Sequence, residues 1–419
     1  MTTLPDKLHP QRVQRRTLAV LSLAQIIGGV GVAVGVAFSA LVVAELSGSA
    51  VISGYAGTSM VLGAALMALP IARAADRWGR RAALSLAYAG AAVGAVISVL
   101  GITIANWPVL LFGFLLLGGG SAGNLAARYS ATDLSPPGHT ARHLSLVVWM
   151  TTIGSVTGPN LAGPADRLGQ DLGLAETAGP FALSALAFVL ALVIIQAALR
   201  PDPLLLARRL DGAAPGASAR RFNLRESWQV LRSSPAAMRA LVAIAVSQTA
   251  MVSIMSMTPV HLNHGGASLE IIGLTLSLHI AGMYVLSPVV GKLADKAGTV
   301  PVLVLGMVIL LAAAVLAATA GHGTVQIAVA LVLLGLGWSC GLVAGSALLT
   351  ESVPVERRPS VQGFSDLLMN VCGAGGTVLA GFIVGWLSYG VLGAAVGVLV
   401  TLTGLWLLTT RHRTTPTPA

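Results

Sequence analysis

Residues 17–44 read TLAVLSLAQIIGGVGVAVGVAFSALVVA and contain no charged side chain. A helix needs roughly 20 apolar residues to cross the hydrocarbon core of a bilayer, and this run is longer. It is also longer than the apolar core of a signal peptide, and no convincing cleavage site follows it. We therefore interpret it as a retained transmembrane helix.

The rest of the chain repeats this pattern. Hydrophobic residues make up 55% of the chain and charged residues 10%, which is more apolar surface than a soluble protein can hide. Lipid offers the backbone no hydrogen-bond partner, so each apolar run is expected to be helical. The predicted fold class is an all-α integral membrane protein with twelve transmembrane helices. The eleven further runs lie at about 53–72, 83–105, 109–130, 143–165, 178–199, 240–260, 271–291, 300–320, 324–349, 361–386 and 388–410.

The net charge of +10 would suit a nucleic-acid-binding protein, but the placement of the charges argues against that class. With the N-terminus in the cytoplasm, every Lys and Arg except Arg167 falls in a cytoplasmic segment. This is the positive-inside pattern of polytopic membrane proteins. We expect a multi-pass protein of the inner (cytoplasmic) membrane, embedded in the lipid bilayer, with both termini in the cytoplasm and no nucleic-acid partner.

Enzyme and metal chemistry find little support in the residue pattern. Cys340 and Cys372 both lie in predicted spans and indicate neither a disulfide framework nor a metal site. His261 and His264 fall in an outer loop without an evident set of partners. No phosphate-binding loop of the Walker type occurs. The sequence therefore predicts no enzyme, no cofactor and no metal.

The two halves of the chain match each other. PIARAADRWGRR (70–81) recurs as PVVGKLADKAG (288–298), DLSP (133–136) as ESVP (351–354), and GPNLAG (158–163) as GTVLAG (376–381), each 218 or 219 residues further on. Repeats of this kind build carriers whose substrate site lies between the halves near the midplane. We expect a cytoplasmic tail at 1–16, six-helix bundles at 17–199 and 240–410, a cytoplasmic linker at 200–239, and a second cytoplasmic tail at 411–419.

Two loops resemble the cytoplasmic signature of the major facilitator superfamily. They are ARAADRWGRR (72–81) and GKLADKAG (291–298). Together with the number of spans and the central linker, the resemblance covers essentially the whole chain and implies two pseudo-symmetric six-helix bundles. The first copy has Ala72 where the family usually has glycine, which predicts looser helix packing there.

In the superfamily, the acid of this loop latches the cytoplasmic side against the start of span eleven and an arginine at the end of span four. The resemblance therefore implies a latch at Asp76, with Arg128 as its partner or Arg142 as the substitute. Alternatively, the arginines of the loop only anchor the topology. Asp133 and Glu351 occupy matched positions shortly before prolines and near Arg142 and Arg357. They suit ion pairs that break and re-form in a gate. Alternatively, they are simply solvated loop charges. The predicted gating residues are Asp76, Arg77, Gly79, Arg80, Arg128, Asp133, Arg142, Asp295, Gly298, Glu351 and Arg357.

A second motif lies in span five. Gly154, Gly158, Pro159 and Gly163 resemble the signature associated with the superfamily's proton-exchanging exporters, which favours export. Pro159 removes a backbone hydrogen bond and is expected to bend the helix. The alternative is a packing kink that does not bear on direction.

The family's usual proton-relay residues are missing from the first half, where span four has Phe114 and span one has Gln25. Ionisable groups inside a membrane are costly and are functional candidates by default. His279 in span eight and Asp366 in span eleven are therefore the candidate proton carriers, acting as a joint relay. Alternatively, His279 is a neutral imidazole bonded between helices, and Asp366 is a capping or latch carboxylate.

The predicted cavity lining is polar or aromatic with little fixed charge, which suits a small amphiphilic solute. The function favoured is secondary active transport by a monomer, as proton-coupled export. A proton-coupled importer of a small nutrient such as a vitamin remains the alternative. The candidate lining residues are Gln25, Asn124, Trp149, Gln248, Tyr284, Trp338 and Asn370.

Overall fold

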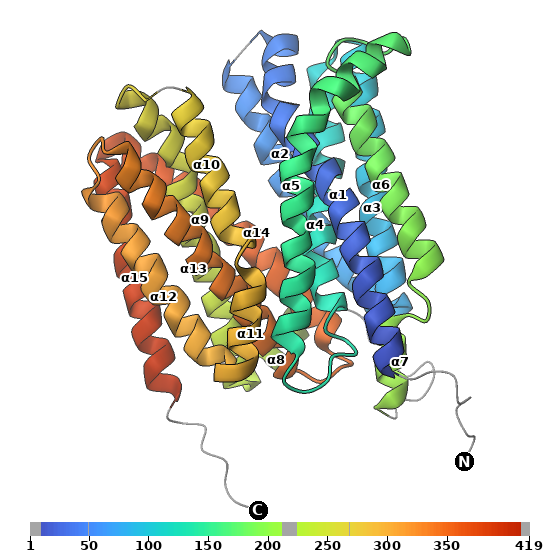
Figure 1. The fold of residues 1–419 in the computed structure, drawn as a ribbon, viewed down its shortest axis with the longest axis vertical. Helices are drawn as coiled ribbons and strands as arrows, with labels where there is room; N and C mark the ends of the chain where they lie inside the picture. The colour runs from blue at the N-terminus through green and yellow to red at the C-terminus, as the bar shows by residue number, and fades with distance from the viewer. Residues whose placement is uncertain (1–9, 49, 212–223, 268, 412–419) are drawn as a thin grey trace, which may run out of the picture. The chain divides into compact units, whose positions relative to one another are not determined.

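The computed structural model describes residues 10–48, 50–211, 224–267 and 269–411. Within these ranges the chain is almost wholly helical and contains no strand (Figure 1). In chain order the helices are α1 (Pro10–Ser47), α2 (Ala50–Trp78), α3 (Arg80–Thr103), α4 (Trp107–Ser130), α5 (Thr140–Asp171), α6 (Gly179–Ala198), α7 (Pro203–Leu210), α8 (Leu224–Ser233), α9 (Pro235–His264), α10 (Leu269–Tyr284), α11 (Ser287–Ala297), α12 (Thr299–Thr319), α13 (Thr324–Glu351), α14 (Arg358–Trp386) and α15 (Tyr389–Arg411).

Eleven helical stretches in the described part of the chain are long and apolar enough to cross a membrane. They account for eleven of the twelve predicted spans. The remaining span corresponds to α5, which has 32 residues but is less apolar because His143, Asn160 and two prolines interrupt it. The predicted all-α, membrane-spanning fold class is confirmed.

Several helix boundaries differ from the prediction; α2, for example, continues to Trp78, and α9 begins at Pro235. α1 already begins at Pro10, and the span predicted at 271–291 is divided into α10 and α11. The division has a local cause, because Pro288 has no N–H to donate to the carbonyl of Tyr284 four residues earlier. The hydroxyl of Ser287 donates to that carbonyl instead, at 2.8 Å.

The chain divides into two compact units. The first contains the described parts of Met1–Pro136, Met150–Val230 and Pro354–Asn370. The second contains those of Pro137–Trp149, Leu231–Val353 and Val371–Ala419. The start of α14 therefore belongs to a unit otherwise made of first-half helices and their linker, and the start of α5 belongs to the other unit.

Close helix contacts through glycine shape the first unit. A Cβ on Gly63 of α2 would overlap the carbonyl of Leu115 on α4, and a Cβ on Gly118 of α4 would overlap the carbonyl of Met60 on α2. Only glycine permits this approach of two backbones, as expected of helices that associate by van der Waals contact in lipid.

The second unit uses the same device between α10 and α13. A Cβ on Gly282 would lie 2.5 Å from the carbonyl oxygen of Val332, and one on Gly335 would lie 2.5 Å from that of His279. The matching construction follows from the internal repeat, since both pairs of helices occupy equivalent positions in their halves.

The linker between the predicted halves contains two short helices, α7 and α8. In α7 the apolar side chains of Leu204 and Leu206 are buried, so this segment is packed within the first unit. Trp228 of α8 is half exposed and its ring lies 6.2 Å from that of Phe364.

Candidate gating site

The turn between α2 and α3 is the structural basis of the first signature loop. Gly79 has a φ of +88°, a conformation that L side chains rarely adopt. Asp202, the N-cap residue of α7, accepts a hydrogen bond from the backbone N–H of Arg81 at 2.8 Å. A Cβ on Gly79 would lie 2.5 Å from this carboxylate, so glycine is needed for both the turn and the contact.

Asp76 at the end of α2 pairs with Arg208 of α7. Nη2 of Arg208 donates to Oδ1 of Asp76 at 2.8 Å, and Nη1 donates to the Asp76 carbonyl at 2.8 Å. The predicted partner of Asp76 was Arg128 or Arg142, and this prediction is wrong. The sequence could not distinguish among many arginines, because the fold decides which one is in reach.

Arg128 at the end of α4 pairs instead with Asp366 of α14, at 2.7 Å. The side chain of Arg128 is almost fully buried and also lies over the ring of Tyr129, 4.5 Å from its centre. Asp366 is therefore held in an ion pair between a first-half helix and α14.

A third buried ion pair joins Arg80 to Asp133. The guanidinium of Arg80 donates from Nε to Oδ2 at 2.7 Å and from Nη2 to Oδ1 at 3.0 Å. The same Nη2 also donates to the side-chain oxygen of Gln362 on α14, at 2.7 Å. This bidentate geometry is the strong form of an arginine–carboxylate contact. We refer to Arg80–Asp133, Arg128–Asp366 and Arg208–Asp76 as the three buried ion pairs.

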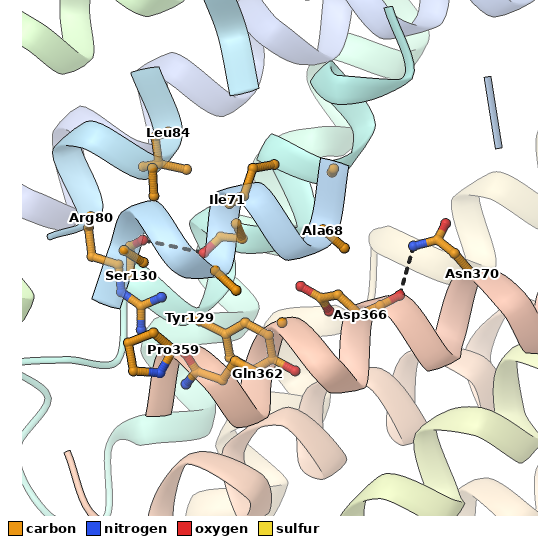
Figure 2. A pocket seen from close by; sticks show the side chains of 16 residues that line it. Ala68, Ile71, Arg80, Leu84, Tyr129, Ser130, Pro359, Gln362, Asp366 and Asn370 are labelled. Atoms are coloured by element: carbon orange, nitrogen blue, oxygen red, sulfur yellow. Dashed lines mark hydrogen bonds between the residues drawn. The ribbon is translucent and has the colours of Figure 1, made fainter. Parts of the chain in front are cut away.

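A small cavity lies beside Arg80 and Asp366, which belong to two of these pairs. Figure 2 shows Arg80 and Gln362 near Tyr129, with Asp366 and Asn370 further along α14. The volume of this cavity is about 20 Å³, which is enough for one water molecule. The amide of Asn370, a predicted cavity residue, donates to the carbonyl of Asp366 at 2.8 Å.

The departure at Ala72 does not loosen the packing. Ala72 is buried, and Gly363 of α14 lies directly against it, so a Cβ on Gly363 would overlap the Ala72 methyl group. Glycine is therefore present at this contact, on the opposite helix. In the second unit the arrangement is reversed: a Cβ on Gly291 would overlap the hydroxyl of Ser145 on α5.

The second signature loop binds its acid differently. Asp295 accepts hydrogen bonds from the backbone N–H groups of Ala141 at 3.0 Å and Arg142 at 2.9 Å. These groups open α5, where a helix N-terminus attracts negative charge. Gly298 ends the loop with a φ of +92°. The side chain of Arg142 is exposed, and it is the backbone of this residue that contributes.

The remaining predicted gating residues have separate surroundings. Arg357 pairs with Glu226 of α8. Glu351 is exposed and forms no ion pair within the described ranges. Arg77 lies over the ring of Trp78, 4.9 Å from its centre.

In span five, two of the three motif glycines are contact sites with α1. A Cβ on Gly154 would lie 2.6 Å from the carbonyl oxygen of Ile26, and one on Gly158 would lie 2.8 Å from the Cβ of Ala33. A Cβ on Gly163 would meet nothing within 4 Å. Pro159 lies inside the continuous helix α5.

His279 is fully buried in α10. Its Nδ1 lies 2.7 Å from the carbonyl oxygen of Leu331 on α13, and its Nε2 has no hydrogen-bond partner in the described structure. This contact fits the alternative reading of an imidazole bonded between helices. Asp366 and His279 lie in different units, each with its own partner.

The predicted cavity residues form short polar contacts within each unit. In the first unit the Gln25 amide donates to the hydroxyl of Thr151 at 2.8 Å. In the second unit, Nε1 of Trp338 donates to the side-chain oxygen of Gln248 at 2.7 Å, and the ring of Tyr284 stands edge-on to Trp338 at 5.8 Å.

Two further predicted cavity residues complete this set. In the first unit, Asn124 accepts from the hydroxyl of Tyr88 at 3.1 Å. In the second unit, Trp149 is half-buried.

Three residues of the site were missed from the sequence. Arg208 is one of several arginines in the linker, Gln362 is an uncharged residue, and Asp202 resembles a loop acid. Only the position of Asp202, one residue before a proline that opens a short apolar run, could have identified a helix cap.

Long apolar helices and an internal repeat define a polytopic membrane transporter. A family model described as the Major Facilitator Superfamily matches residues 20–269 and again 261–419. The chain belongs to this superfamily, as the signature loops predict.

Relatives and solved structures agree with this assignment. The chain is 37% identical to the MFS-type transporter YdeG of Bacillus subtilis (strain 168) over 398 residues, which cover 94% of this chain and 91% of YdeG. It is 28% identical to the riboflavin transporter RfnT of Brucella anthropi over 356 residues, 85% of each chain.

Among solved structures, the human organic anion transporter MFSD10 matches with a TM-score of 0.74 and 16% identity, covering 94% of this chain and 99% of that one. The proton:xylose symporter XylE matches with a TM-score of 0.71 and 14% identity, covering 96% of each. At these identities the likeness shows the fold.

Proposed function

We propose that the protein is a secondary active transporter that exports a small amphiphilic organic solute in exchange for protons, by alternating access. It works as a monomer in the inner membrane with both termini in the cytoplasm. The observation that carries this proposal is the set of three buried ion pairs, two of which tie first-half helices to α14 or to the linker helix α7.

Such pairs suit a reversible closure. Removing one partner of a buried ion pair costs about 3–5 kcal/mol, whereas the intact pair contributes little net stability over apolar packing. A contact of this kind holds one state firmly, yet costs little once both charges regain water together. That is the behaviour required of a gate that opens in each transport cycle.

The contacts around the candidate lining residues support an amphiphilic substrate. Amide side chains at Gln25 and Gln248, and rings at Trp338 and Tyr284, combine hydrogen-bonding groups with apolar surface. A multiply charged anion would call for several arginines at this depth. The close α1–α5 packing at Gly154 and Gly158 is the feature that favours export.

Asp366 is the first candidate for proton coupling, because protonation would remove the charge that binds Arg128. His279 is the second, because its Nε2 is buried without a partner in the described structure. In vesicles with an imposed proton gradient, Asp366→Asn and His279→Gln should each abolish the response of solute flux to the gradient. Unchanged coupling in either variant would remove that residue from the mechanism.

The alternative function is proton-coupled import of a small nutrient such as a vitamin. The similarity to RfnT, a riboflavin transporter, favours it. It would also explain why the first half lacks the usual relay residues of exporters.

Two assays separate the functions. Cells with and without the protein are exposed to a panel of toxic amphiphilic compounds, with an Arg128→Ala variant as the matched control. Export predicts resistance to at least one compound that the variant loses. Sensitised cells, or exchange of labelled riboflavin into vesicles preloaded with riboflavin, would instead establish the importer.

A further inference from the structure

The linker helix α7 is fixed to the first signature loop at its beginning. Oδ1 of Asp202 accepts from the N–H groups of Leu204 and Leu205, both at 3.1 Å, and so caps α7. Oδ2 of the same carboxylate accepts from the N–H of Arg81, in the first turn of α3. One side chain therefore caps two helices and aligns α7 with the turn at Gly79.

Arg208, in the last turn of α7, contacts the other end of this loop. The residue is only 4% exposed. Arg208 donates to Oδ1 and to the backbone carbonyl of Asp76, as described above, and its Nη2 also donates to the carbonyl of Glu356 at 3.3 Å. Glu356 lies two residues before α14. A side chain of the linker thus bridges the end of α2 and the segment that leads into α14.

The internal repeat allows the surroundings of Asp76 to be compared with those of Asp295. In the second half, Asp295 is held by the N–H groups of Ala141 and Arg142 at the start of α5. The residues 218 positions further on, at the start of α14, are Pro359 and Ser360. Proline has no N–H. The N–H group that Ala141 donates to Asp295 in the second half therefore has no counterpart for Asp76, because the equivalent residue is Pro359.

We propose that Arg208 is a gating residue that supplies to Asp76 the hydrogen bond that Pro359 cannot give, so that the linker helix α7 is a working part of the gate. This role rests on the proposed alternating-access function. When α14 separates from α2, Arg208 must release either Asp76 or the Glu356 carbonyl. The state of the linker is thereby coupled to the opening of this end of the protein.

The test follows opening directly and needs no substrate. Ala126 is buried and lines the small cavity beside Pro359. Ala126→Cys is introduced into a background of Cys340→Ala and Cys372→Ala, and its reaction rate with a charged maleimide is measured on purified protein in nanodiscs. The latch variants are Arg208→Ala, Pro359→Ala and the double variant Arg208→Ala/Pro359→Ala.

Arg208→Ala should raise the labelling rate at least about tenfold, because a buried carboxylate loses its partner. Pro359→Ala alone should leave the rate unchanged. The double variant should react at least about threefold more slowly than Arg208→Ala, because the restored N–H supplies one of the lost hydrogen bonds. A purely structural role for Arg208 gives no reason for rescue by a backbone N–H on another helix.

An unchanged rate in Arg208→Ala overturns the proposal, as does a double variant as reactive as the single one. If Arg208→Ala fails to fold, Arg208→Lys is measured instead and should give an intermediate rate that Pro359→Ala again lowers. Arg128→Ala distinguishes a failure of the role proposed for Arg208 from a failure of the proposed gate. If it opens the site and Arg208→Ala does not, the role of Arg208 is wrong; if neither does, the gate itself is wrong.

Discussion

The two signature loops share a carboxylate, a glycine of positive φ and a place in the repeat, but they are held by different chemistry. Asp295 is half-buried and accepts two backbone N–H groups at the start of α5. Asp76 is buried and is held by a guanidinium. Arg80 and Arg128 add two further ion pairs in the first unit. The corresponding positions of the second half, 219 and 218 residues further on, are the uncharged Thr299 and Ser346.

This difference shows that a duplicated fold can keep its geometry while changing the strength of a contact. A carboxylate at a helix N-terminus contributes about 0.3–1 kcal/mol when exposed and up to about 2 kcal/mol when partly buried. Breaking one buried ion pair costs about 3–5 kcal/mol. The first-half loop should therefore hold its closed state more firmly than the second-half loop.

The largest difference is expected at Asp133 and its repeat partner Glu351. Asp133→Ala leaves Arg80 buried without its charge partner and should destabilise the protein by about 3–5 kcal/mol. Glu351→Ala removes an exposed charge and should change stability by less than about 0.5 kcal/mol. Thermal unfolding of both variants in detergent measures this, and equal losses would contradict the asymmetry.

A smaller effect is expected at the two loop glycines. Gly298→Ala introduces left-handed strain of about 1–2 kcal/mol, and its Cβ would meet only Pro301, at 3.6 Å. Gly79→Ala has the same strain and also a clash with Asp202, so its cost should be about 2–3 kcal/mol. Thermal unfolding again provides the measurement. The idea that α7 is docked on this turn fails if Gly298→Ala is the more costly change.

The contacts of Gly363 with Ala72 and of Gly291 with Ser145 can be tested by paired substitutions within each half. Gly363→Ala should raise the labelling rate of the Ala126→Cys reporter and cost about 1–2 kcal/mol through overlap with Ala72. Ala72→Gly in the same chain should restore both values. In the second half, Ser145→Gly should lower the cost of Gly291→Ala only in part, because the Ala141 carbonyl oxygen would still lie 2.7 Å from the new Cβ, and Ala72→Gly should not lower it. Rescue across the two halves would show that the contacts are not specific.

The smallest effect is expected at Ala141. Ala141→Pro removes one of the two N–H donors to Asp295, while proline is tolerated in a first helical turn. The expected loss is about 1 kcal/mol, measured by thermal unfolding against Ala141→Gly, which keeps the N–H. A loss above about 3 kcal/mol would mean that the second-half loop is held as firmly as the first.

The sequence predicted the fold class well, because hydropathy and charge placement report directly on the bilayer. Hydropathy does not reveal local interruptions of a helix, such as the break before Ser287, because that break depends on the single proline at 288. Asp76 was identified from the loop motif, since glycine and acid spacing is a local property. Its partner was not, because reach between Asp76 and Arg208 depends on the path of the linker.

Motif glycines were only partly informative for the same reason. Gly154 and Gly158 are close-packing sites, whereas Gly163 faces open space. A sequence pattern identifies small residues, but the register of two helices determines which of them are in contact. The glycine opposite Ala72 lies 291 residues away in the chain, beyond any local pattern.

The contact between Ala72 and Gly363 also constrains which pairs of residues these two positions can hold. A chain with glycine at both positions would keep the helices in contact, whereas alanine at 72 facing a larger residue at 363 would force them apart. Homologues that carry glycine at 72 should vary freely at 363 among small residues, and those with alanine at 72 should not.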